Sequence, residues 1–388
     1  MSATSFSIGR KAFCKPARPR THLMYAVSMM AKMAAAVCLL TGAITLGAAG
    51  VEFEIDQPGA FEDNNLLNRA AACGSPWSTD CFNRNRCVGP SGAQELSIYV
   101  HDAVCSNSPS TALIASNSND SNGNCGSVCI AALSLIREKA QAKGLLAERP
   151  EEACLIVAGL RTGHRCVSRS STWDDGRNHL IIDFNDQQRS YFSDVDGGLA
   201  MFASSNMQTS YFRYGHDIPV PLPPKHTFGY LADVAPNARR YFATFKGHLY
   251  LSGGGVVERT TVRQIASSTA SPDVIVVENC QEKHKEHLLP ENLDLCQGLL
   301  EEFSKQDYAD LMNSTFALIP AGRSPATFRL GEALSAGAIP VFLHEGYVKP
   351  FPTKIPWDLC SFSFPIAQAE AVLGTLRGIP EKTLLEMQ

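Results

Sequence analysis

The segment 313–341 combines residue types that can hold a phosphate with a spacing that would bring them together. Gly322 and Arg323 follow the apolar run 315–320, and Thr327 lies among the first residues of a helical pattern. Backbone amides at a helix N-terminus attract anions, and an arginine can hold a phosphate with two parallel hydrogen bonds. The segment by itself is equally compatible with an ordinary α/β repeat that binds no ligand.

The pattern around these residues is a strand, a glycine turn, a helix and a second strand. Ser324 and Pro325 predict the helix start, with Ser324 as the N-cap, and Gly337 predicts its end. The run 338–343 begins the second strand. Such a βαβ unit belongs to a parallel, doubly wound sheet, in which ligands bind beyond the carboxyl ends of the strands.

Strand-like and helix-like segments alternate over the rest of the chain, which predicts an α/β fold with two domains. Strands are predicted at 96–100, 153–158, 179–183, 241–245 and 273–277. Helices are predicted at 129–142, at 197–205 from its small residues, after Gly255 and at 303–312. The proline-rich segment 218–224 can be neither helix nor central strand, so it marks the domain boundary.

The first 51 residues resemble a membrane address. Residues 1–32 contain basic but no acidic residues, and 33–51 carry no charge, which is enough for one helical span. The basic flank predicts a cytosolic N-terminus and a type II anchor. A cleaved signal peptide, cut near the small residues 47–50, is the alternative, and both place residues 52–388 in the secretory lumen.

Composition is compatible with that compartment. The chain has 13 cysteines, and only Cys14 and Cys38 do not follow the apolar segment. Asn119 and Asn313 begin glycosylation sequons. The net charge of −4 does not indicate a nucleic-acid-binding protein, which is expected to be basic.

Several separate blocks resemble the exostosins, inverting glycosyltransferases of the Golgi and endoplasmic reticulum that use nucleotide sugars. The resemblance covers about residues 73–388. The matching blocks are Cys81-Phe-Asn-Arg-Asn-Arg-Cys87, Glu152–Val157 with Gly176–Ile181, Tyr241–Gly247 with Tyr250–Gly253, Asn313–Phe316 with Gly322-Arg323, and Phe328–Leu334.

This resemblance implies two Rossmann-like domains facing a cleft (GT-B type), with a UDP-sugar held mainly by the second domain. The domain assignment that follows is a cytosolic tail at 1–32, a transmembrane signal-anchor at 33–51, a stem at 52–92, an N-terminal acceptor domain at 93–235 and a C-terminal nucleotide-sugar domain at 236–388. The implied partners are a UDP-sugar, a glycan or proteoglycan acceptor, the membrane through the N-terminal helix, and a second exostosin copy or relative.

Cations and aimed amides stabilise the charge that grows on a leaving diphosphate. The expected nucleotide-binding residues are Lys246, Arg259, Arg323, Thr327, Arg329 and Glu332. Glu332 resembles the family carboxylate that holds the ribose hydroxyls. The alternatives are an intrahelical pair between Glu332 and Arg329 and, for Lys246 and Arg259, a solvated charge.

An inverting transfer also needs a general base, which inverting enzymes of this fold usually supply from the first domain. Asp183, His179 and Asp194 are the candidates. The segment 159–165 lacks the acidic residues that animal exostosins carry there, which leaves the acceptor contacts open. Ala321, Ser324 and Pro325 make the donor loop less basic than the animal one, so the sugar need not be glucuronate.

We expect no required metal or other cofactor. Asp194 and Asp196 imitate a metal-binding Asp-x-Asp but precede two glycines, which favours a turn. His284 and His287 lack further ligands. The family pattern suggests a Cys280–Cys296 disulfide. A Cys81–Cys87 disulfide is the other candidate, but Cys73 could pair with either of these cysteines instead.

The overall hypothesis is transfer of a sugar from a UDP donor to a glycan, with glucuronyl transfer in heparan-type chains as the nearest specific activity. There are two alternatives. The chain transfers another sugar onto a matrix or wall polysaccharide, or it is a non-catalytic exostosin-like subunit. Because the sequence stops at Gln388 within a helical pattern, it is either a fragment or a short relative of exostosins.

Overall fold

The computed structural model of the chain describes residues 82–89, 91–93, 95–101, 127–159, 170–184, 197–251, 253–269, 271–280 and 290–388. These residues divide into two compact units, one ending at Pro223 and the other comprising Pro224–Gln388. Each unit contains one five-stranded sheet whose strand pairs are all parallel. Two parallel sheets of this kind are consistent with a GT-B-like fold.

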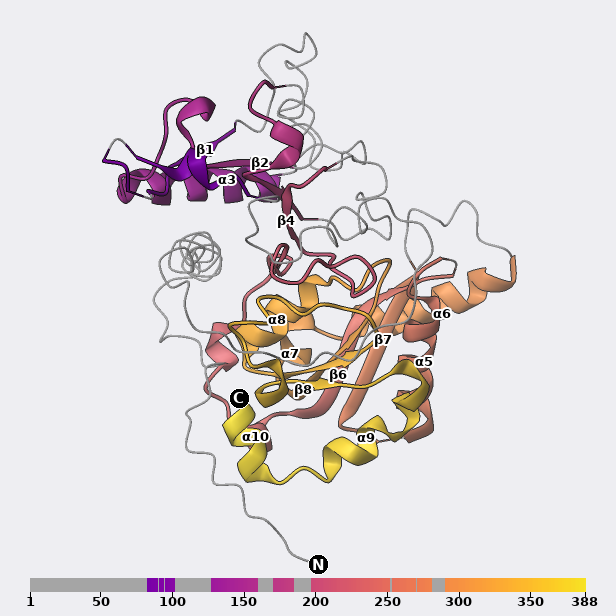
Figure 1. Cartoon of the computed structure of the whole chain (residues 1–388). Helices are drawn as coiled ribbons and strands as arrows, with labels where there is room; N and C mark the ends of the chain where they lie inside the picture. Colours follow the sequence, from indigo (N-terminus) through magenta and orange to yellow (C-terminus); the bar gives the residue numbers. More distant parts are fainter. Residues whose placement is uncertain are drawn as a thin grey trace, which may run out of the picture. The chain divides into compact units, whose positions relative to one another are not determined.

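The first unit has its strands in sequence order across the sheet, from β1 to β5. Its elements are β1 Ile98–Val100, α3 Ser127–Ala142, β2 Leu155–Gly159, β3 His179–Asp183, β4 Met201–Ser204 and β5 Ile218–Pro219. Helix α3 packs along β1 and β2, as Figure 1 shows. The strands predicted at 96–100, 153–158 and 179–183 and the helix predicted at 129–142 are therefore confirmed.

Strand β4 occupies part of the segment 197–205, for which the sequence analysis predicted a helix. That prediction is wrong, because Met201 to Ser204 pair in parallel with β3. All four strand residues are buried. A strand that is covered on both faces shows a continuous run of buried residues without polar alternation, so periodicity alone could not separate it from a short buried helix.

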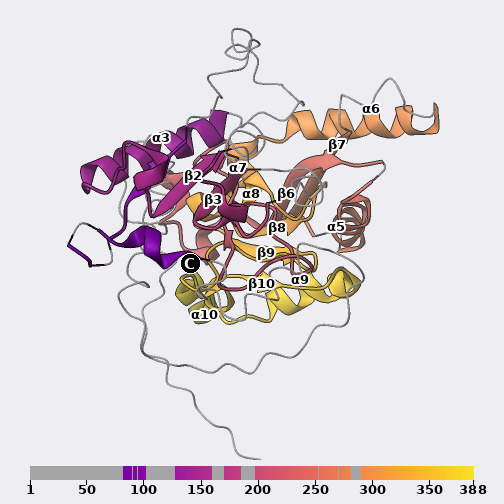
Figure 2. The same ribbon diagram turned by 45° about the horizontal axis from the view of Figure 1, so that its top comes forward.

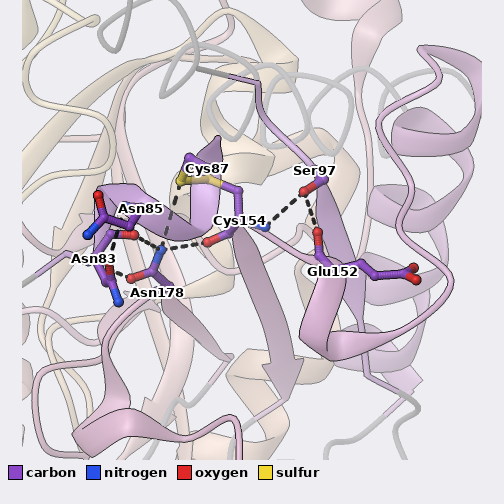
Figure 3. The surroundings of a disulfide bond; sticks show 7 residues. All are labelled: Asn83, Asn85, Cys87, Ser97, Glu152, Cys154 and Asn178. Atoms are coloured by element: carbon purple, nitrogen blue, oxygen red, sulfur yellow. Dashed lines mark hydrogen bonds between the residues drawn. A yellow bond between two sulfur atoms is a disulfide. The ribbon is translucent and has the colours of Figure 1, made fainter. Parts of the chain in front are cut away.

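A disulfide and one asparagine anchor the start of the described chain to the first sheet. Cys87 is bonded to Cys154, which precedes β2, so the Cys81–Cys87 pairing considered from the sequence is wrong. Asn178 accepts a hydrogen bond from the Asn83 backbone N–H at 2.7 Å, and its amide donates to Cys154 O at 2.7 Å and Asn83 O at 3.0 Å (Figure 3). One buried side chain thus satisfies three backbone groups next to the disulfide.

The second unit has the strand order β10-β9-β8-β6-β7. Figure 2 shows its elements, which are β6 Tyr241–Leu249, α5 Val256–Thr269, β7 Val274–Cys280, α6 Pro290–Lys305, α7 Tyr308–Leu311, β8 Ser314–Pro320, α8 Phe328–Ala336, β9 Ile339–Leu343, β10 Phe362–Ser363, α9 Ala369–Arg377 and α10 Glu381–Met387. The strands predicted at 241–245, 273–277, 315–320 and 338–343 are all present. The predicted Cys280–Cys296 disulfide is also confirmed.

Alternation along β8 shows how the helices cover this sheet. Phe316 and Leu318 pack in a core with residues of α5 and α9, whereas Ala317 packs with Ala333 of α8. Because successive side chains of a strand point to opposite faces, α5 and α9 lie on one face and α8 on the other.

Helix α8 begins three residues later than the sequence predicted. Its N-cap is Thr327, whose hydroxyl accepts a hydrogen bond from the Arg329 N–H at 3.3 Å, so the Ser324 cap was a wrong prediction. Ser324 instead belongs to the preceding loop, where its carbonyl accepts from the Gly322 N–H at 3.0 Å. The predicted end is confirmed, because Gly337 is the C-cap with a left-handed φ of 68°.

No helix among the described residues is long and apolar enough to span a membrane. The predicted tail and anchor at 1–51, and most of the predicted stem at 52–92, lie outside the described residues.

We predict that Asn178→Ala destabilises the first unit by about 3 kcal/mol. The change leaves buried backbone groups without hydrogen bonds and places alanine at a left-handed φ of 61°. The free energy of unfolding, measured by urea denaturation, should fall accordingly. Asn85→Ala, at a neighbouring exposed asparagine, is the matched control and should change it by less than about 0.5 kcal/mol. An unchanged Asn178→Ala variant would contradict the anchoring role.

Candidate anion-binding site

The second sheet reverses its winding between β6 and β8. From β6 the chain passes through α5 on one face to β7, and from β8 it passes through α8 on the other face to β9. Loops 250–255 and 321–327 therefore follow two neighbouring strands at this switch point. In open α/β sheets, ligands bind beyond the carboxyl ends of the strands at such a point.

The backbones of these two loops touch at a pair of glycines. A Cβ atom on Gly255 would lie 2.4 Å from the Gly322 carbonyl oxygen, and Gly255 also has a left-handed φ of 84°. Any side chain at Gly255 would therefore push the loops apart. The glycines that the sequence placed next to the predicted strands make this close approach possible.

Arg259 on α5 contacts both of these loops. Its Nε donates to Ala321 O at 2.9 Å, and Nη1 lies 3.4 Å from His248 O. The guanidinium stacks 4.6 Å from the ring centroid of Phe245 and 5.4 Å from that of Tyr250. Burial lowers the pKa of Arg259 from its ordinary value. The residue thus contributes a desolvated positive charge directly under the switch point.

Further positive charges gather around the loops. Arg323 lies 5.7 Å from the ring centroid of Tyr250, on which Arg259 also stacks. Lys225 places its ammonium 4.2 Å from the ring centroid of Phe328, the first residue of α8. His248 feels both arginines and Lys225, and burial together with these charges lowers its pKa. This arrangement combines a helix N-terminus with three cationic side chains, which is suited to a phosphate.

Glu332 lies one turn into α8 and is almost fully buried. Its carboxylate accepts hydrogen bonds from the Tyr308 hydroxyl and from the His226 backbone N–H, the latter at 3.3 Å. No ion pair between Glu332 and Arg329 is found among the described residues, so the intrahelical pair offered as an alternative does not form. The carboxylate is instead fixed by the segment that enters the unit and by α7.

Arg329 and Lys246 make structural contacts. Arg329 donates to Leu318 O at 3.0 Å and to Thr244 O at 2.7 Å, which ties α8 to β8 and β6. Lys246 donates to Phe303 O and Gln306 O at 2.9 and 2.5 Å, at the carboxyl end of α6. A lysine there complements the helix dipole. Burial lowers the pKa of Lys246.

In the first unit, two of the predicted general-base candidates occupy opposite ends of one strand. Asp183 ends β3 and accepts a hydrogen bond from Ser204 Oγ at 3.2 Å, whereas His179 begins the strand. They are four residue steps apart along the strand, a distance of roughly 13 Å. His179 is fully buried, its Nδ1 lies 2.7 Å from Arg177 O, and its ring packs against Trp173. Asp194 lies outside the described residues.

Lys225, Tyr250 and Tyr308 were not predicted as site residues from the sequence. Lys225 and Tyr308 belong to no local motif, since each meets the site only through the packing of distant segments. Tyr250 begins the block Tyr250–Gly253 beside the glycine turn, and that position could have indicated it. Within the described part of the chain, no group of three His, Cys, Asp or Glu side chains is placed to hold a metal. Asp196, His284 and His287 are not among the described residues.

Comparison with known proteins supplies the family context. A family model described as the Exostosin GT47 domain matches residues 93–379. Exostosin-1c of Danio rerio is 32% identical over 238 residues, covering 54% of this chain and 31% of that protein. Exostosin-1 of Bos taurus is 30% identical over 268 residues, covering 62% of this chain and 35% of that protein. The chain thus spans about a third of the length of these curated relatives.

We predict that His179 destabilises the fold in acid. Burial lowers the pKa of His179 to about 4, while an unfolded histidine has a pKa of about 6.5. Below pH 6.5 the unfolded chain binds a proton that the folded chain does not, so stability falls by about 3 kcal/mol as the pH drops towards 4.

His179→Gln should remove this share of the pH dependence of the urea midpoint between pH 7 and 4.5. The control His226→Gln removes an exposed imidazole and should leave the slope as it is. An unchanged slope in the His179 variant would show that this histidine is not held neutral by the fold.

Proposed function

Because this chain belongs to the exostosin GT47 family, we propose that it is a glycosyltransferase that binds the nucleotide of a UDP-sugar in its second unit. The observation that carries the proposal is the switch point between β6 and β8, where Gly255 meets Gly322 above the buried guanidinium of Arg259. The relatives are exostosins by name, and the resemblance stated from the sequence is confirmed at the level of the family.

The proposed binding mode assigns each group a part of the donor. Arg259, Arg323 and Lys225, together with the first amides of α8, would hold the diphosphate and stabilise the charge that grows on it during transfer. Glu332 would accept hydrogen bonds from the ribose hydroxyls. Its two present donors, the Tyr308 hydroxyl and the His226 N–H, keep the carboxylate in one orientation. No metal is part of this mode, since the charge is met by side chains and a helix terminus.

For the first unit we propose Asp183 as the general base. It is the described candidate at a carboxyl strand end, where ligands of parallel sheets bind, whereas His179 lies at the opposite end of β3. The donor sugar and the acceptor are left open, with glucuronyl transfer and transfer of another sugar to a polysaccharide as alternatives. We further propose the type II membrane topology that residues 1–51 predict, with both units in the secretory lumen.

The test of the proposed function is UDP binding by the purified chain, followed by a panel of UDP-sugars with mass spectrometry of the products. We predict that Arg323→Lys weakens UDP binding by about tenfold, because lysine cannot replace a bidentate guanidinium. The control is Arg377→Lys. Arg377 ends α9 and forms a surface ion pair with Asp273, so this variant should bind UDP as the wild type does. A folded wild-type chain that binds no UDP would refute the proposal.

A second prediction separates a ribose-binding Glu332 from a purely structural one. Glu332→Gln should weaken UDP binding by about tenfold and leave the binding of inorganic diphosphate unchanged, because only UDP carries a ribose. Calorimetric titration with both ligands measures the two effects. Equal loss of both affinities, accompanied by a lower melting temperature, would show that Glu332 only supports the fold.

A further inference from the structure

A buried carboxylate lies beside Arg259 that the proposed binding mode does not use. Glu278 on β7 pairs in register with Gly247 on β6, so the two residues are neighbours on the same face of the sheet. Glu278 is 2% exposed, and neither carboxylate oxygen has a hydrogen-bond partner among the described residues. A buried acid without hydrogen bonds is costly, and such a group calls for a specific explanation.

The geometry shows what this carboxylate faces. A Cβ atom on Gly247 would lie 2.5 Å from Nη1 of Arg259, so this nitrogen lies next to Gly247, the register partner of Glu278. The charge of Arg259 acts to lower the pKa of Glu278. Arg263, one turn further along α5, brings its Nε to 4.0 Å from the carboxylate. Glu278 therefore sits between two guanidinium groups without a hydrogen bond to either.

We propose that Glu278 is a positioning residue for the donor diphosphate, because its ionised carboxylate competes with the phosphates for the positive charge of Arg259. The proposal rests on the function proposed above and adds a proton-dependent control of donor affinity. An ionised Glu278 offsets part of the charge of Arg259 and Arg263. A protonated Glu278 leaves both guanidinium charges to the bound anion.

The carboxylate changes its charge in the relevant pH range. Burial raises the pKa of Glu278 to about 7, although Arg259 and Arg263 act to lower it. A bound diphosphate repels the ionised form, so binding raises this pKa further and takes up a proton. Diphosphate affinity is therefore expected to fall as the pH rises through 7.

Other charged groups near Arg259 do not produce the same dependence. His248 lies beside it on β6, and burial lowers the pKa of His248, whereas burial raises the pKa of Glu278. Tyr250, Glu258 and Arg329 interact with Arg259 and not with Glu278. On α6, which packs on β7, the acids Glu301 and Glu302 are exposed.

The experiment is calorimetric titration of the full chain with UDP from pH 6.5 to 8.5. If UDP raises the pKa of Glu278 by about one unit, the wild-type affinity should fall roughly fivefold over this range. The terminal phosphate of UDP titrates with a pKa of about 6, and its ionisation changes affinity in the opposite direction. Glu278→Gln should bind tightly and without this fall.

Two further variants sharpen the result. Glu258→Gln removes a neighbouring acid on α5 and should keep the wild-type fall in affinity. Arg263→Gln removes a charge that lowers the pKa of Glu278, so the fall should move to higher pH. Two outcomes would overturn the inference and leave the proposed function standing. In the first, UDP binding by the wild type does not depend on pH, and in the second, Glu278→Gln keeps the wild-type dependence. A folded chain that binds no UDP at any pH would overturn it together with the proposed function.

Discussion

The second unit depends on the way Arg259 joins two loops that follow neighbouring strands. The guanidinium donates to Ala321 O in one loop and stacks on Tyr250 in the other, while Gly255 and Gly322 let the backbones approach each other. A buried guanidinium loses much of its hydration, and aromatic faces and carbonyl oxygens restore only part of it. The arrangement therefore holds a strong positive charge in place before any ligand binds, which is the condition for electrostatic catalysis.

Three buried arginines of this unit donate to backbone carbonyl groups, and they differ in where those carbonyl groups lie. Arg329 donates to carbonyl groups of β6 and β8, and Arg239 donates to Ala336 O and Gly337 O at the end of α8, with burial lowering its pKa to about 10. Both act as internal clamps that satisfy backbone carbonyls. Arg259 shares this structural work, but it does so at the switch point. A side chain in that position can serve folding and binding together.

Strand direction decides which residues of the first unit can take part in chemistry. Asp183 and His179 belong to the same strand and are both buried, yet only Asp183 ends it. Burial, with Trp173 against the ring, keeps the imidazole of His179 neutral, although the Arg177 carbonyl at Nδ1 acts to raise its pKa. Its burial therefore contributes to acid sensitivity of the fold more readily than to proton transfer at neutral pH.

The sequence by itself determined the α/β class, most of the strands, the glycines and arginines of loops 250–255 and 321–327, and the family, because these are carried by local periodicity and by contiguous motifs. It also gave the Cys280–Cys296 disulfide through the family pattern. The register of β4, the Cys87–Cys154 bond and the placement of Lys225, Tyr308 and Glu278 were decided only by the tertiary structure. They depend on which face of a sheet a residue occupies and on what distant segment packs there, and short-range spacing does not encode either.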